Sequence, residues 1–180
     1  MTKERITERI TERITDEFVF FHGGPLSNWH RCSIWVPTDS GNLEFRSSEQ
    51  LFMYIKAHTF NDFEAAQKIL ECTTPREAKE LGRQVKGFDE SAWERVRESV
   101  MLYAVSYKFK NPDLRQYLLS SKFSGKSFVE GSPTDCVWGI GVDWRDSLAD
   151  DKKNWRGMNL LGKCLDKVRQ NINNVDLTIF

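Results

Sequence analysis

Hydrophobic and polar positions change their spacing near residue 17 of this chain. Before that point the tetrapeptide Glu-Arg-Ile-Thr occurs three times between residues 4 and 15, which places Ile6, Ile10 and Ile14 near one face of a helix. Three isoleucines make a thin apolar stripe, so residues 1–16 are expected to form a solvated, flexible extension. The alternative is an amphipathic helix that docks on a partner, which predicts that removal of residues 1–16 abolishes function.

Short apolar, aromatic-rich pieces separated by turns follow the repeat. Residues 18–21, 32–36 and 43–46 have this character, with Gly23-Gly24-Pro25 and the stretch 37–42 between them. This pattern predicts three short strands and a small sheet.

Five helix starts follow. Each is marked by a polar side chain that can accept a hydrogen bond from the free amides of the first helical turn. They are Ser47, Asn61, Thr74, Ser91 and Asn111; Gln or Glu stands three residues after the first four, and Pro directly follows Thr74 and Asn111. The helix predicted over residues 91–107 has one broad apolar face and is expected to be central. Residues 124–141 predict an irregular stretch, and a last helix is expected over residues 157–170.

These elements predict an α+β fold. One compact, helix-dominated domain is expected over residues 17–173, with a small sheet of short strands packed on about six helices. A length of 180 residues fits one domain. Residues 174–180 are expected to be a C-terminal tail.

Composition and charge exclude several classes of function. Lys plus Arg and Asp plus Glu both number 26, so no net charge attracts the chain to nucleic acid or an anionic membrane. No apolar run reaches the roughly 20 residues of a membrane span, and residues 1–16 are too polar for a signal peptide, so a cytoplasmic location is expected. The cysteines, Cys32, Cys72, Cys136 and Cys164, lack the spacing of a metal site, and neither a metal nor a cofactor is expected.

Several short motifs, taken in order, resemble the NADAR/YbiA family. They are Phe20-Phe21, Leu26-Ser27-Asn28-Trp29, Arg46-Ser47-Ser48-Glu49-Gln50 with Lys56-Ala57, Trp93, Met101, Lys108-Phe109, Leu118-Leu119, Glu130 to Ser132, Trp138-Gly139-Ile140-Gly141, Gly157-x-Asn159-Leu160-Leu161-Gly162 and Arg169. The resemblance extends over residues 18–169 and leaves the N-terminal repeat outside. Trp29 stands where the family usually has Phe, and Gln50 where His is common, which points to a difference in base or sugar selectivity.

The resemblance implies an enzyme that hydrolyses the N-glycosidic bond between a ribose phosphate and a base. Members of the family act on phosphoribosylated aminopyrimidine intermediates of riboflavin synthesis, and others remove ADP-ribose from guanine in nucleic acids. The expected partner is therefore a small ribosyl phosphate or ADP-ribosyl substrate, with ADP-ribosylated nucleic acid as a further candidate. The alternative is a non-catalytic module that binds ADP-ribose or a nucleotide in the same pocket.

Glu49, Lys56 and Asp135 are the expected catalytic residues. Cleavage of an N-glycoside builds positive charge on the anomeric carbon, which a carboxylate such as Glu49 stabilises. Lys56 lies about 10 Å further along the same helix face. The resemblance implies that a lysine traps the opened sugar as an imine, with Lys56 as the first candidate and Lys108 as the second.

Aromatic rings and a glycine are expected to form the base-binding part of the site. Trp93 and Trp138 offer flat faces on which a base can stack, but Trp93 also fits the apolar face of its own helix. Gly139, beside Trp138, allows backbone to approach a ligand. The pocket is expected where the helix from Ser47, the helix around Trp93 and the Trp138 loop meet.

Four polar residues complete the expected site. Glu130 and Asp135 either orient water and ribose hydroxyls or serve as turn and cap residues. Asn28 and Arg31 are expected to hold a phosphate or a sugar hydroxyl, and Arg is the better partner for phosphate.

Overall fold

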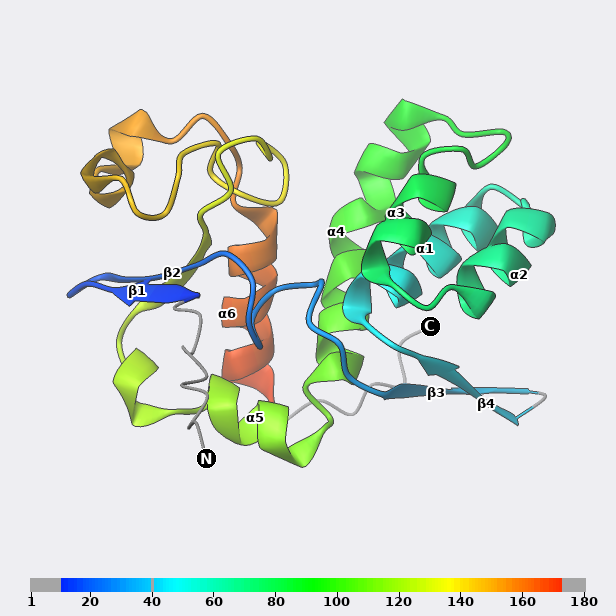
Figure 1. Ribbon diagram of the computed structural model, residues 1–180, viewed down its shortest axis with the longest axis horizontal. Coiled ribbons are helices and arrows are strands. Elements are labelled where there is room, and N and C mark those ends of the chain that lie inside the picture. The colour runs from blue at the N-terminus through cyan, green and yellow to red at the C-terminus, as the bar shows by residue number, and fades with distance from the viewer. Residues whose placement is uncertain (1–10, 40, 173–180) are drawn as a thin grey trace, which may run out of the picture.

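Residues 11–39 and 41–172 are described by the computed structural model, which has the expected α+β architecture (Figure 1). The strands are β1 (Glu12–Ile14), β2 (Phe18–Phe21), β3 (Ile34–Thr38), β4 (Gly41–Phe45) and β5 (Ser127–Glu130). The helices are α1 (Ser48–Thr59), α2 (Phe63–Glu71), α3 (Pro75–Gly82), α4 (Glu90–Lys108), α5 (Pro112–Leu118) and α6 (Leu160–Asn171), and short 3-10 turns cover Ser121–Phe123, Ser147–Asp150 and Lys152–Asn154. None of the helices described is long and apolar enough to span a bilayer.

The strands form two small sheets rather than one. Strand β2 pairs antiparallel with β1 and parallel with β5, while β3 and β4 form a separate hairpin. In Figure 1 the three-stranded sheet lies beside α5 and α6, and the hairpin lies on the side of α1, α2 and α3. Helix α4 packs against both α1 and α6 and so joins the two halves, as its predicted central position requires.

Strand β2 is buried along its whole length, as an unbroken apolar sequence predicts. Val19 and Phe21 point into the main hydrophobic core, and Phe18 and Phe20 pack into a second cluster with Trp144 and other residues. Strand β5 was not expected, because its sequence lies in the glycine- and serine-rich stretch 124–141. It is a short parallel partner of β2 and shows no polar-apolar alternation.

The last copy of the N-terminal repeat is a strand rather than part of a helix or a solvated extension. Residues 12–14 form β1, and the register pairs Arg13 with Phe20. Ile14 remains 41% exposed, so the repeat gains order mainly from backbone pairing. Ile6 and Ile10, and the tail 174–180, lie outside the described residues.

Three of the five predicted helix starts are confirmed and two shift by one or two residues. Ser47, Thr74 and Asn111 cap α1, α3 and α5 through their side chains, and Thr74 forms the complete capping box with Glu77. Asp62 caps α2 and Asp89 caps α4, in place of the predicted Asn61 and Ser91. In both places a second residue of a type that caps helices stands one or two positions from the observed cap, so the sequence pattern does not separate the two.

Candidate functional site

A cavity of about 1160 Å³ opens at one edge of the three-stranded sheet. Because β2 and β5 are parallel and Phe21 pairs with Glu130, the segments that follow both strands leave the sheet at the same edge. His22 and Gly23 come from the first segment, and Ser132 to Val137 from the second. Helix α3 forms the opposite wall with Arg76, Lys79, Glu80 and its C-cap residue Arg83, and Trp29, Trp144 and Arg145 also line the cavity.

Glu49 lies in the first turn of α1 and is 5% exposed. Its backbone NH donates to the carbonyl of Asn28 (3.1 Å), and its Oε1 is buried and has no hydrogen-bond partner among the described residues. Burial raises the pKa of the Glu49 carboxyl to about 7. Glu49 is not itself among the residues that line the cavity, but the charges that act on its carboxyl come from Lys79, Asp135, Glu130 and Arg83, which all line it, so Glu49 lies near the cavity. An unpartnered buried carboxylate is costly and indicates a role beyond packing.

Glu130 is a second buried carboxylate, at the end of β5. Its Oε1 lies 3.2 Å from Nδ1 of His22, and its Oε2 is buried with no hydrogen-bond partner in the described part of the chain. Burial raises the pKa of Glu130, and the hydrogen bond from His22 opposes that rise. The same contact raises the pKa of His22. One oxygen of Glu130 is therefore fixed by His22, while the other can accept a hydrogen bond from a ligand.

Asp135 and Gly139 shape the loop after β5. Oδ1 of Asp135 accepts hydrogen bonds from the backbone NH groups of Val137 (2.9 Å) and Trp138 (2.8 Å). A Cβ on Gly139 would lie 2.8 Å from the carbonyl oxygen of Glu130, so only glycine lets the loop return this close to β5. Asp135 lines the cavity, and one of its carboxylate oxygens is bound to the turn.

Lys108, at the C-terminal end of α4, is 1% exposed. Its Nζ donates to the carbonyl of Ser27 at 2.7 Å, and Ser27 lines the cavity. Burial lowers the pKa of the Lys108 ammonium to about 7, and interactions with Cys32 and Glu130 partly oppose this. A lysine of this kind supplies a neutral amine near neutral pH, as nucleophilic catalysis by an amine requires.

Lys56 lies away from the cavity. Its Nζ donates to the carbonyl of Gly82 (2.8 Å) and sits 4.0 Å from the ring centre of Phe88. Although Glu49 and Lys56 share one side of α1, Glu49 lies in the first turn, next to the cavity, and Lys56 in the last. The structure therefore brings Lys108, rather than Lys56, to the neighbourhood of the carboxylates.

Of the residues predicted to bind the substrate, Glu130 lines the cavity and the other six do not: Lys108 and Gly139, described above, and Trp93, Trp138, Arg31 and Asn28. Trp93 is in the core and packs against Phe52 (5.2 Å between ring centres), and Trp138 meets the same ring edge-on at 5.1 Å. Arg31 is exposed and is not a lining residue, although Trp29, two residues before it, is one. Asn28 is buried, and its side-chain oxygen accepts a hydrogen bond from Ser48 Oγ (3.0 Å), so it positions the start of α1.

The cavity also contains groups that the sequence analysis missed. Its wall comes from α3 rather than from the helix around Trp93, which corrects the predicted position of the pocket. Arg76, Lys79 and Arg83 recur at helical spacing on one face of α3, a signal visible in the sequence, but only the tertiary structure shows what this face meets. In residues 11–39 and 41–172, none of the three forms an ion pair with a carboxylate. Lys79 lies over the exposed Trp29 ring at 5.6 Å.

Two buried carboxylates and a buried amine near one cavity, with cations along its wall, are typical of the active site of an enzyme. Comparison with known proteins agrees with this class: residues 19–173 match the NADAR domain family, and the chain belongs to it.

Several relatives of this chain are named N-glycosidase. The N-glycosidase R617 of Acanthamoeba polyphaga mimivirus is 36% identical over 86% of this chain and 96% of its own length. Protein irg-1 of Caenorhabditis elegans is 42% identical over 72% of this chain and 62% of its own length. The NMR structure of the Escherichia coli protein YbiA superimposes with a TM-score of 0.68 at 26% identity, covering 96% of this chain and 94% of that protein.

Proposed function

We propose that this chain is an N-glycosidase that hydrolyses the C–N bond between a base and a ribose phosphate or ADP-ribose. The enzyme class is supported by the relatives named N-glycosidase, and one similar protein is named a riboflavin biosynthesis protein. The observation that carries the proposal is the buried Glu49 carboxyl, which has an unpartnered oxygen beside a cavity lined by cations. Such a carboxylate can meet the positive charge that develops on the anomeric carbon.

Glu49 acts as the carboxylate on the sugar side of the bond. As the C1′–N bond breaks, the base takes up the bonding electron pair and C1′ becomes positive, and Glu49 stabilises that charge or removes a proton from the attacking water. The water oxygen forms the new bond to C1′, and its proton ends on the base. Burial makes the interaction of Glu49 with this charge stronger than it would be in water.

Lys108 offers a second route to the same products. A neutral Nζ attacks C1′ of the opened ribose, the base departs, and water then hydrolyses the imine to release the sugar and the amine. The Lys108 Nζ is buried and donates to the carbonyl of Ser27, a residue that lines the cavity, so the amine lies close behind the lining. The free oxygen of Glu130 is suited to a ribose hydroxyl, and Asp135 to a second hydroxyl or to water.

The cationic face of α3 binds the phosphate groups of the substrate. Arg76 and Arg83 are seven residues apart, or about 10 Å along the helix axis, which is wider than one phosphate group. With Lys79 between them, the row fits two adjacent phosphates better than one, and so favours an ADP-ribosyl substrate over a monophosphate. The exposed Trp29 ring next to Lys79 offers a stacking face for a base.

Neutralising the α3 cations is expected to weaken substrate binding. Arg76→Gln and Arg83→Gln should each raise KM or Kd for an ADP-ribosyl ligand roughly tenfold, because each removes a hydrogen-bonded charge pair. With ribose 5-phosphate only one of the two variants should lose affinity. Calorimetry with both ligands measures this, with Arg95→Gln, an exposed arginine of α4 outside the cavity lining, as the matched control. Equal losses for the two ligands would remove the argument for two phosphates.

Activity is expected to increase with pH through neutrality. The Glu49 carboxyl and the Lys108 ammonium both have a pKa of about 7, so above this pH the former is ionised and the latter neutral, as the proposed roles require. The pH profile of kcat/KM for the free enzyme should therefore rise between about pH 6 and pH 8. A fall over that range would show instead that protonated Glu49 acts as an acid on the base.

The proposal is tested by incubating the protein with an oligonucleotide carrying ADP-ribosylated guanine and, separately, with a phosphoribosylated aminopyrimidine. Chromatography follows the released base or sugar. Release that disappears in Glu49→Gln supports a glycosidase, and the faster substrate identifies the substrate class. Binding of ADP-ribose without release from either substrate would instead support a non-catalytic binding module.

A further inference from the structure

We propose that Arg13, in the last copy of the N-terminal repeat, is a positioning residue that fixes the Trp144–Arg145 wall of the cavity and thereby sets substrate affinity. The inference rests on the proposed function of that cavity. Residues 19–173 match the family, so Arg13 lies N-terminal to the matched region, on a strand that pairs with the first matched residues.

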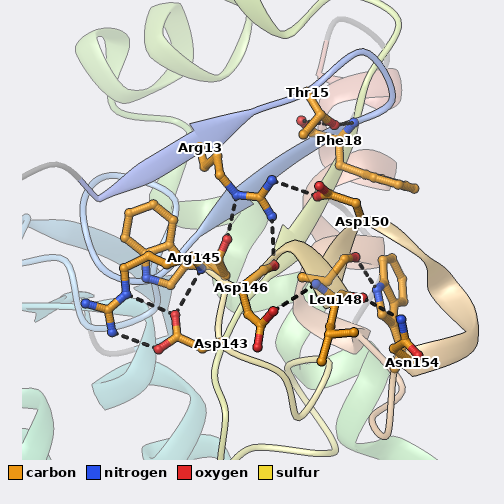
Figure 2. A network of polar contacts seen from close by, with 12 residues as sticks. Arg13, Thr15, Phe18, Asp143, Arg145, Asp146, Leu148, Asp150 and Asn154 are labelled. Carbon is orange, nitrogen blue, oxygen red and sulfur yellow. Dashed lines mark hydrogen bonds and ion pairs between the residues drawn. The ribbon is translucent and has the colours of Figure 1, made fainter.

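The Arg13 guanidinium makes four contacts, and three of them are with the segment that carries this wall (Figure 2). Nε donates to the Trp144 carbonyl (2.7 Å), Nη1 pairs with the Asp150 carboxylate (2.7 Å), and Nη2 donates to the Asp146 carbonyl (3.4 Å). The planar group also lies 4.4 Å from the ring centre of Phe20. One side chain of β1 thus holds three points of a segment more than 130 residues away in sequence.

The held segment has little regular structure of its own. Between residues 143 and 154 it contains two 3-10 turns, stabilised by Asp caps and by contacts such as Trp155 Nε1 to the Ala149 carbonyl (2.7 Å). The one backbone hydrogen bond of Trp144 NH is to Gly131 (3.1 Å), at the end of β5. Such a segment depends on side-chain contacts for a single conformation, and Arg13 supplies several of them.

Two residues of the segment face the cavity. Trp144 and Arg145 line it, and Arg145 is oriented by Asp143, which accepts hydrogen bonds from its Nε and its Nη2. Thr11, beside Arg13, lines the cavity as well, and its carbonyl accepts the His22 NH (3.0 Å). The strand therefore fixes two sides of the cavity: the Trp144–Arg145 wall through Arg13, and the His22 loop through Thr11.

The test is a set of double-mutant cycles on kcat and KM in the full chain. Arg13→Gln is expected to raise KM about fivefold and to leave kcat within about twofold. Arg13→Lys keeps the positive charge but not the planar set of guanidinium donors, so it should recover part of the lost substrate affinity. Combining Arg13→Gln with Arg145→Gln should raise KM no further than the stronger single variant. Combination with Arg83→Gln, on the opposite wall, should multiply the two effects. Arg95→Gln is the control for loss of a surface charge.

Two results would overturn the inference. One is an unchanged KM in Arg13→Gln together with a lower Tm, which would make Arg13 a stabilising residue only. The other is a multiplicative effect of Arg13→Gln and Arg145→Gln, which would mean that the two act independently. Absence of turnover in the wild-type chain would contradict the proposed function instead, and the cycles would then be measured on the Kd for ADP-ribose.

Discussion

Glu49→Gln is expected to lower kcat at least about 100-fold and, at the same time, to make the protein more stable at pH 8. The loss of turnover follows from removal of the charge that meets the developing cation, since electrostatic and acid–base groups typically contribute 10²–10⁴-fold. The gain in stability follows from the raised pKa of about 7, compared with an ordinary value of 4.5. Rate measurements and thermal unfolding of the two proteins at the same pH test both parts.

The sign of the stability change depends on pH. A carboxyl whose pKa is higher in the folded state holds its proton better when folded, so its ionisation destabilises the protein as pH rises from about 4.5 to 7. At pH 8 that cost is of order 3 kcal/mol, and a neutral Gln avoids it. Tm should then increase by several degrees at pH 8 and change little at pH 4.

Glu80→Gln is the matched control for Glu49. Glu80 also lines the cavity, but it is exposed. Neither kcat nor Tm of the Glu80→Gln variant should therefore change by a comparable amount. If Glu49→Gln retained normal kcat, the proposed role of this carboxylate would be wrong even though its burial would still explain the change in stability.

Lys108→Met is expected to abolish the amine-dependent route, with a loss of turnover of roughly 100-fold or more. Methionine fills a similar volume without the amine, and the buried Ser27 carbonyl then loses its donor at 2.7 Å. Borohydride added during turnover reduces an imine to a stable amine. Mass spectrometry should therefore find a sugar adduct on the wild-type protein and none on Lys108→Met.

Lys56→Met distinguishes the two lysines. Because the Lys56 ammonium binds the Gly82 carbonyl and the Phe88 ring, its replacement should lower Tm by a few degrees and leave the adduct in place. An adduct that disappears in Lys56→Met and persists in Lys108→Met would reverse the assignment. Turnover without an adduct in any variant would favour direct attack by water.

The sequence predicted features that depend on residues within about four positions of one another. The capping box of Thr74 and Glu77 is one example, because the donors and acceptors of a first helical turn are neighbours in the chain. Strand β2 is another, because four apolar residues in a row require burial on both faces. The motif of Glu49 predicted a site at the start of α1, and the buried carboxyl found there is consistent with it.

Only the tertiary structure decided what surrounds that carboxyl. Spacing on one helix placed Glu49 and Lys56 on the same side, but the cavity lies near one end of α1, and Lys108, at the end of α4, bonds to the lining residue Ser27. The sequence contains the α3 cations and Arg13, but it does not show which segments they face, because those segments are tens of positions or more away along the chain. Local patterns are set by contacts within a turn, whereas a cavity is formed by the packing of distant segments, so the sequence determined the elements and the fold determined which residues share the site.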